Sequence, residues 1–151
     1  MKFQLAVISP RKQRLKSGAA HEMLQDFIRR AGRYAPTELG FFDTEASFLA
    51  ATSRTPGRTR PYVVLLDSTG DTLTSSQFAE RVRAIQDGGS QQMVLAIGPA
   101  DGWSSAGRAA ADLVFSLGAI TLAHELALVV TAEQLYRALT ILAGHPYHSG
   151  H

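Results

Sequence analysis

The 151-residue sequence contains no cysteine. This absence excludes disulfide bonds, catalysis by a thiolate and zinc sites built on cysteine. It also suits a reducing compartment, so we expect a cytoplasmic protein. With 45% hydrophobic and 19% charged residues, the composition is that of an ordinary globular protein. We therefore expect a single domain over residues 1–151, long enough to bury a core.

Long apolar runs are missing as well. The longest, residues 126–142, is interrupted by Glu133, Gln134 and Arg137. It predicts a buried or partner-facing helix rather than a membrane span. The first residues, MKFQLAVISPRKQR, hold only a short apolar run before a basic cluster, which argues against a secretion signal.

Several motifs of nucleotide and metal enzymes are absent. The stretch 98–102, GPADG, does not match the glycine pattern of dinucleotide-binding loops, and no glycine loop is followed by the lysine of a phosphate-binding loop. His124-Glu125 begins a zinc-protease motif, but Leu128 occupies the position of its second histidine. Ser104 and Ser105 resemble a nucleophile elbow without its last glycine, and a helix N-cap explains them better.

Three histidines fall in the C-terminal stretch HPYHSGH: His145, His148 and His151. No further ligand stands at a recognisable spacing, and Pro146 ends the preceding helix, so we expect no metal site. Proline and tyrosine stiffen the HPYH part, whereas residues 149–151 have the composition of a frayed end.

The positive charge is concentrated in the first part of the chain. Residues 1–60 hold 11 Lys and Arg against 5 Asp and Glu, and residues 61–151 hold 4 against 8. The basic clusters are Arg11, Lys12, Arg14 and Lys16; Arg29, Arg30 and Arg33; and Arg54, Arg58 and Arg60. Such clusters attract polyanions, nucleic acid first. A solvated helix face and a flexible basic loop explain the same pattern.

Short apolar runs alternate with amphipathic segments along the chain. The runs predict strands at 3–8, 37–42, 62–67, 93–97 and 113–117, and the segments predict helices at 19–32, 44–52, 74–85, 105–111 and 124–143. The spacing of Thr74 and Gln77 is that of a capping box. This order predicts an α/β fold, with three α/β/α layers and a mostly parallel sheet.

Glycine-bearing loops follow three of the predicted strands, at residues 67–71, 98–105 and 117–123. Parallel sheets bind their ligands beyond the carboxyl ends of the strands, and glycine permits close approach of the backbone. Ordinary turn chemistry explains each loop alone. Together the three loops favour a pocket for a small molecule.

These segments, taken in their order along the chain, resemble those of one known protein family. The stretches LLDSTG, SSQFAERV, LAIGPADGWS, FSLGAITLAHELA and AEQLYRALTILAGHPYH resemble the RlmH family of ribosomal RNA large-subunit methyltransferases, of the SPOUT class. The resemblance implies a C-terminal trefoil knot and a homodimer with active sites at the subunit interface. It also implies S-adenosylmethionine as cofactor and, as substrate, a pseudouridine in the helix 69 loop of 23S rRNA, methylated at N3.

The resemblance also implies which residues form the site. The cofactor pocket would contain Leu66, Gly98, Leu117, Gly118, Ala119, Ile120, Thr121 and Leu122. The catalytic residues would be His124, Arg137, Tyr147 and His148. The HPYH segment would lie on the RNA side of the pocket, with Tyr147 and His148 contacting the target nucleoside. Arg137 would orient a phosphate or polarise a carbonyl; a salt bridge with Glu133 at i,i+4 spacing is the alternative, and both can hold. We expect Tyr136 to pack in the core or at a dimer interface.

The sequence departs from the family pattern at three positions. Pro99 replaces a second glycine of a GGPEG-like loop, and Leu128 and Ser149 replace arginines. Pro99 removes an amide donor, and the other two changes remove positive charge. Two alternatives therefore stay open: a SPOUT-like domain that binds RNA or nucleotide without catalysis, and a methyltransferase for another RNA such as tRNA.

Overall fold

The five apolar runs form one parallel sheet in the computed structural model, which describes residues 1–10 and 18–150. The strands are β1 (Lys2–Ile8), β2 (Thr37–Phe42), β3 (Tyr62–Thr72), β4 (Gln92–Ile97) and β5 (Leu113–Ser116). Their order in the sheet is β2-β1-β4-β3-β5. Every adjacent pair is parallel, as the alternation of strands and helices predicts.

The helices also lie where the amphipathic segments predict them. They are α1 (Ala19–Ala31), α2 (Glu45–Thr52), α3 (Ser75–Asp87), α4 (Ser105–Ala110) and α5 (His124–Leu142), followed by the 3-10 helix η2 (Pro146–His148). The predicted capping box starts α3: Gln77 N donates to the Thr74 hydroxyl, and Thr74 N donates to the Gln77 side chain. Thr44 caps α2 in the same way.

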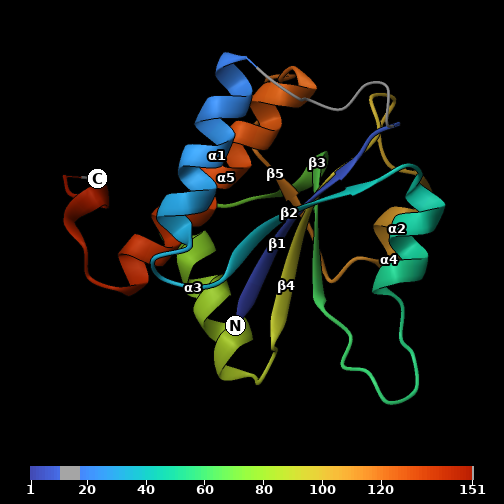
Figure 1. The fold of residues 1–151 in the computed structure, drawn as a ribbon, viewed down its shortest axis with the longest axis horizontal. Coiled ribbons are helices and arrows are strands. Elements are labelled where there is room, and N and C mark those ends of the chain that lie inside the picture. The colour runs from blue at the N-terminus through green and yellow to red at the C-terminus, as the bar shows by residue number, and fades with distance from the viewer. Residues whose placement is uncertain (11–17, 151) are drawn as a thin grey trace.

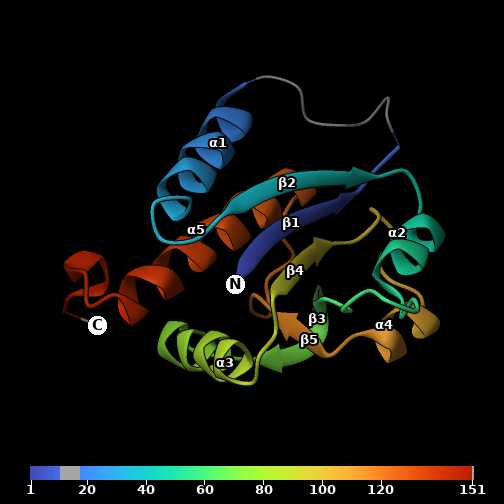
Figure 2. The same ribbon diagram turned by 60° about the horizontal axis from the view of Figure 1, so that its bottom comes forward.

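The helices cover both faces of the sheet, which completes the three layers. Figure 1 shows α1, α3 and α5 on one face and α2 and α4 on the other, and Figure 2 shows the same division. Strand β1 serves both layers, because Phe3, Leu5 and Val7 belong to the core under α5 while Ala6 and Ile8 belong to the core under α2. This double burial explains why the strands are continuous apolar runs.

The prediction of a loop at 67–71 is wrong in its extent. Strand β3 continues to Thr72: after an irregularity beyond Leu66, Asp71 and Thr72 pair with Phe115 and Ser116 of β5. The polar sequence of this stretch hides the pairing, because one side of it faces solvent.

Two predictions cannot be compared with the structure. The basic residues Arg11, Lys12, Arg14 and Lys16, and also His151, lie outside the described residues. Among the helices of the described ranges, none is long and apolar enough to cross a bilayer.

Candidate functional site

A cavity of about 180 Å³ lies beside the carboxyl ends of β4 and β5, next to the irregularity of β3 that follows Leu66. It is lined by Leu66, Asp67, Ser68, Ile97, Leu117, Gly118, Ile120, Thr121, Leu122 and Ala127. The structure thus brings together all the residues predicted for the cofactor pocket except Gly98 and Ala119. Cavities that enclose a drug-sized ligand measure roughly 300–1,000 Å³. This one therefore holds only part of such a molecule unless another surface covers it.

Gly118 shapes the loop between β5 and α5. Its φ is +127°, in the region that favours glycine, and a Cβ there would have no atom within 4 Å. The amide of Gly118 donates to the hydroxyl of Ser116 at 3.1 Å, and this hydroxyl donates to the Gly118 carbonyl at 3.1 Å. Glycine is therefore needed here for its backbone conformation rather than for lack of space in the protomer.

Gly98 is not among the residues that line the cavity, and its lack of a side chain is required for packing. A Cβ on Gly98 would lie 2.6 Å from Nε1 of Trp103, a buried ring. The same Nε1 donates a hydrogen bond to the Leu66 carbonyl at 3.1 Å. Trp103 therefore ties the loop after β4 to the middle of β3. Sequence reasoning missed this tryptophan, since nothing in a glycine-rich loop signals which side chain turns inward.

His124 begins α5 and is held by the same loop. Its Nε2 lies 2.8 Å from the Gly98 carbonyl oxygen. A carbonyl only accepts, so Nε2 carries a proton and, in the neutral ring, Nδ1 carries the lone pair. His124 lines a second cavity, of about 340 Å³, together with Pro99 and Asp101. Pro99 thus lies outside the wall of the Leu66–Leu122 cavity, and the carbonyl of Pro99 accepts from Gly102 N to close a turn.

Asp67 contributes a carboxylate to the first cavity that sequence reasoning did not single out. Its Oδ1 accepts from the amide and the hydroxyl of Thr69, at 2.8 and 2.6 Å. Burial acts to raise the pKa of the Asp67 carboxyl, but these hydrogen bonds and the charge of Arg108 outweigh it and hold the pKa below its ordinary value. The cavity wall therefore carries a negative charge at neutral pH.

The C-terminal segment forms a polar network with the last turns of α5. Oε1 of Glu133 accepts from Nε and Nη2 of Arg137, at 3.1 and 2.7 Å, and from the Tyr147 hydroxyl at 3.0 Å. The Arg137 guanidinium also lies over the Tyr147 ring, 4.8 Å from its centroid. The expected pair of Glu133 with Arg137 is confirmed, and HPYH is folded rather than frayed.

Two aromatic contacts secure this segment. Tyr136 is buried, as expected for a packing role, and its ring meets that of Tyr147 edge-on with centroids 4.7 Å apart. The ring of His145 packs against Tyr34. Burial and the hydrogen bond to Glu133 raise the pKa of the Tyr147 phenol, so this group stays protonated near neutral pH.

The ring of His148 is oriented by Arg137. Nη1 of Arg137 lies 3.0 Å from Nδ1 of His148. A guanidinium only donates, so Nδ1 accepts and Nε2 carries the proton. His148 therefore carries its proton at Nε2, and a neutral His124 ring has its lone pair at Nδ1.

The predicted catalytic residues form two separate groups within the protomer. His124 is the first residue of α5, and Arg137 lies 13 residues further along the helix. At 1.5 Å per residue, this spacing corresponds to about 20 Å. Figure 1 shows α5 running from the carboxyl edge of the sheet to the far end, where the C-terminus lies. Tyr147 and His148 therefore do not meet the cavity of their own chain.

Residues 1–10 and 18–150 hold no group of three or more His, Asp or Glu side chains placed to bind a metal ion. The polar groups around the cavity suit an organic ligand, with apolar cover from Leu66, Ile97 and Leu117 and a carboxylate from Asp67.

Comparisons with known proteins agree on one family. A family model described as "Predicted SPOUT methyltransferase" matches residues 1–148. A protein named ribosomal RNA large subunit methyltransferase H, from Koribacter versatilis, is 43% identical over 136 residues, which are 90% of this chain and 92% of that protein. A protein of the same name from Brucella anthropi is 51% identical over 86 residues, 57% of this chain and 54% of its own length.

A solved structure shares the fold. It is the SpoU methyltransferase AviRb from Streptomyces viridochromogenes, in complex with AdoMet. The two structures superpose with a TM-score of 0.51 at 16% sequence identity, over 95% of this chain and 58% of that one. The likeness at this identity concerns the arrangement of strands and helices.

Proposed function

The chain belongs to the SPOUT methyltransferase family, and from this premise we propose that it transfers a methyl group from S-adenosylmethionine to 23S rRNA of the large ribosomal subunit. The observation that carries the proposal is the cavity at the carboxyl edge of the sheet, whose wall is the loop between β5 and α5.

The cavity has the groups that an adenosine-containing cofactor needs. Leu66, Ile97 and Leu117 offer apolar surface for the purine ring. In the described part of the chain, no acceptor takes a hydrogen bond from the amides of residues 119–122. Those backbone amides can therefore donate hydrogen bonds to the edge of the adenine base. The Asp67 carboxylate supplies an acceptor for hydroxyl or ammonium groups.

A second copy of the chain would complete the site. The cavity holds only part of a cofactor, and the C-terminal network lies at the opposite end of α5. We infer a homodimer in which the Tyr147–His148 segment of one subunit lies beside the cavity of the other, on the side where the target nucleoside binds. A two-fold interface allows this exchange twice, so that each dimer has two composite sites.

Methyl transfer depends mainly on how the protein positions the two reactants relative to each other. S-adenosylmethionine, when bound, supplies an electrophilic methyl group that needs no metal. The chain must hold the target nitrogen in line with that methyl group. Nδ1 of His124 carries the lone pair that accepts the proton of the nitrogen, and Nε2–H of His148 donates to a carbonyl oxygen of the base as negative charge develops there.

Glu133, Arg137 and Tyr147 position His148 in this scheme. Arg137 fixes the ring of His148 through Nδ1, and Glu133 fixes both Arg137 and Tyr147. The Tyr147 phenol, with its raised pKa, acts as a hydrogen-bond donor and a stacking surface rather than as a base.

The target that we propose is N3 of a pseudouridine in the helix 69 loop, acted on in the cytoplasm where ribosomes mature. The resemblance to the RlmH family supports this target, as it supports a knotted C-terminus. Of the three departures from the family pattern, Leu128 is buried in the core, so it contributes packing where the family has an arginine. Pro99 lies outside the wall of the proposed pocket.

Two measurements test the proposal. Calorimetric titration with S-adenosylmethionine is expected to show binding, and its absence at millimolar cofactor would favour a domain that binds RNA without catalysis. Mass mapping of 23S rRNA from a strain lacking this gene is expected to show an unmethylated helix 69 pseudouridine that the gene restores. An rRNA unchanged by the deletion would point to another RNA, such as tRNA.

A further inference from the structure

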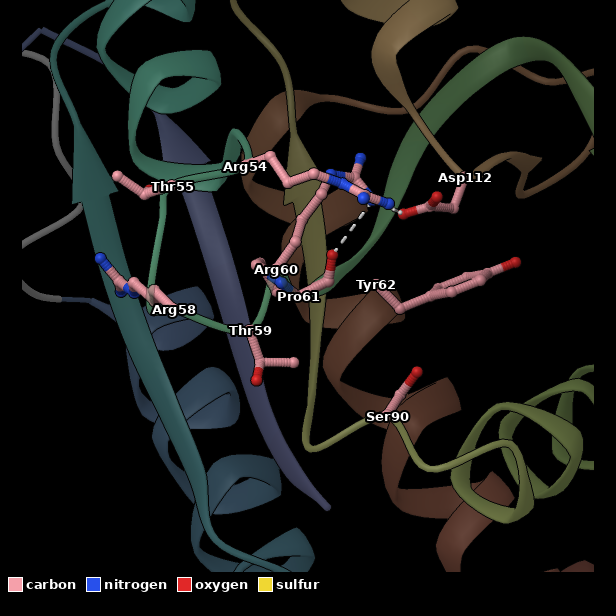
Figure 3. A pocket seen from close by; sticks show the side chains of 9 residues that line it. All are labelled: Arg54, Thr55, Arg58, Thr59, Arg60, Pro61, Tyr62, Ser90 and Asp112. Atoms are coloured by element: carbon pink, nitrogen blue, oxygen red, sulfur yellow. Dashed lines mark hydrogen bonds and ion pairs between the residues drawn. The ribbon is translucent and has the colours of Figure 1, made fainter.

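A third cavity, of about 500 Å³, lies at the amino ends of β3, β4 and β5, opposite the proposed cofactor pocket. It is lined by Arg54, Thr55, Arg58, Thr59, Arg60, Pro61, Tyr62, Ser90 and Asp112. These residues come from the loop between α2 and β3, from the residue that begins β3, and from the turns before β4 and β5. Figure 3 shows Arg54 and Arg60 extending toward Asp112, with Arg58 leaving the loop on the other side.

The loop that carries the three arginines has a defined shape. Arg58 N donates to the Thr55 carbonyl at 3.2 Å, which closes a turn over Pro56 and Gly57. Gly57 has a φ of +76°, and proline followed by such a glycine is the signature of a type II turn. The turn holds Arg54 and Arg58 on its two flanks. Because the turn already fixes this backbone, the loop loses little backbone entropy when the two arginines bind a ligand.

Arg60 anchors this loop and neutralises the acid in the cavity. Its Nη1 donates to Oδ2 of Asp112 at 2.7 Å, and its Nη2 donates to the Ala110 carbonyl at 2.9 Å. The same Oδ2 accepts from Val63 N at 2.7 Å. The negative charge of Asp112 is therefore already satisfied by the protein.

Arg54 and Arg58 remain as available cations. Within the described ranges, neither side chain forms an ion pair or a side-chain hydrogen bond, and both residues are exposed. The lining holds three positive charges against one negative charge, and Thr59 and Ser90 add hydroxyl donors. Guanidinium and hydroxyl donors around a concave surface are the groups that bind phosphate.

We propose that this cavity binds two backbone phosphates of the RNA substrate, one at Arg54 and one at Arg58, away from the reacting nucleoside. The substrate part of this inference rests on the proposed function. Tyr62 of this cavity and Leu66 of the cofactor pocket lie four residues apart in β3, which corresponds to about 13 Å. The phosphate contacts thus anchor the RNA at a fixed distance and carry no base specificity.

The test is the salt dependence of RNA binding, measured without cofactor on a hairpin of the helix 69 sequence. Each phosphate contact contributes roughly 0.7–0.9 to the slope of log K against log salt. The double variant Arg54→Ala/Arg58→Ala should therefore lower the slope by about 1.4–1.8. Between about 50 and 200 mM salt, wild-type binding should weaken about tenfold more than binding by the variant.

Matched variants decide the outcome. Arg81→Ala/Arg83→Ala on α3 removes the same charge elsewhere and should lower the slope less, while Arg54→Lys/Arg58→Lys should keep it. In turnover assays the alanine pair should raise KM for the ribosomal substrate and leave kcat and cofactor affinity near wild-type values. Equal slopes for the two alanine pairs would overturn the inference. A wild-type protein that fails to bind S-adenosylmethionine would overturn the proposed function and leave this test intact.

Discussion

The hydroxyl of Tyr147 donates a hydrogen bond of 3.0 Å to Oε1 of Glu133, across the turn between α5 and the C-terminal segment. The same oxygen accepts from Nε and Nη2 of Arg137. One carboxylate therefore links the position of the C-terminal segment to the position of the arginine that orients His148.

Removing this carboxylate should impair turnover more than binding. In Glu133→Ala, Arg137 and Tyr147 lose their shared acceptor and His148 is no longer fixed. A misplacement of about 1 Å costs roughly 100-fold in rate, so we expect kcat to fall by about that factor. Steady-state kinetics on ribosomal substrate measure it. Glu80→Ala, which removes an exposed acid paired only with Arg83 among described residues, should leave kcat unchanged. Equal kcat values for the two variants would contradict the role of Glu133.

Deleting residues 145–151 should spare cofactor binding and stop turnover. The deletion removes Tyr147 and His148 but leaves the cavity at the other end of α5 intact. Calorimetry should give a wild-type affinity for S-adenosylmethionine while methyl incorporation disappears. A shorter deletion, of residues 149–151, keeps η2 and should retain most of the turnover. Full turnover after the longer deletion would exclude the segment from the mechanism.

Gly118→Val should abolish or strongly weaken cofactor binding. A β-branched residue is strained at a φ of +127° and would distort the loop that lines the cavity. Gly89→Val is the matched control, because Gly89 has a φ of +91° and also lacks neighbours within 4 Å, but it lies in the turn before β4. Thermal unfolding should show similar destabilisation of both variants, and calorimetry should show lost affinity only for Gly118→Val. Unchanged affinity in that variant would refute the pocket assignment.

Asp67 should make stability depend on pH in the acid range. Its pKa in the folded chain lies below the ordinary value of 3.8. Its contribution is therefore complete above that value and is lost as pH falls through the lower, folded pKa. The difference in unfolding free energy between wild type and Asp67→Asn should be constant near neutral pH and shrink under acid. Thr69→Val, which removes one of the hydrogen bonds, should reduce that change. A difference that does not vary with pH would show that the pKa is unperturbed.

The sequence predicts those parts of the fold that depend on local patterns. Apolar runs and capping residues such as Thr74 give the strands and helices, and i,i+4 spacing gives the pair of Glu133 and Arg137. The strand order does not follow from such patterns, because it depends on contacts between distant segments. The pairing of Asp71 with Phe115 is hidden for the same reason.

In the functional site, too, the sequence predicts some features and leaves out those that depend on contacts between distant residues. Family resemblance predicts the loop 117–122, and the structure places most of it around one cavity. The hydrogen bond of Tyr147 to Glu133 depends on how the chain turns after α5, and the cover of Gly98 by Trp103 depends on which loop side chain turns inward. Neither contact has a signature in residue spacing.

The most direct test of the composite site is complementation between two inactive chains. One carries Gly118→Val and keeps its C-terminal segment; the other lacks residues 145–151 and keeps its cavity. If the segment serves the cavity of the partner subunit, a mixed dimer has one intact site. Random mixing should then restore about one quarter of wild-type methyl transfer to ribosomal substrate. If mixing restores no activity while mixed dimers form, or if the active protein is a monomer, the segment does not complete a partner's site and the account is wrong.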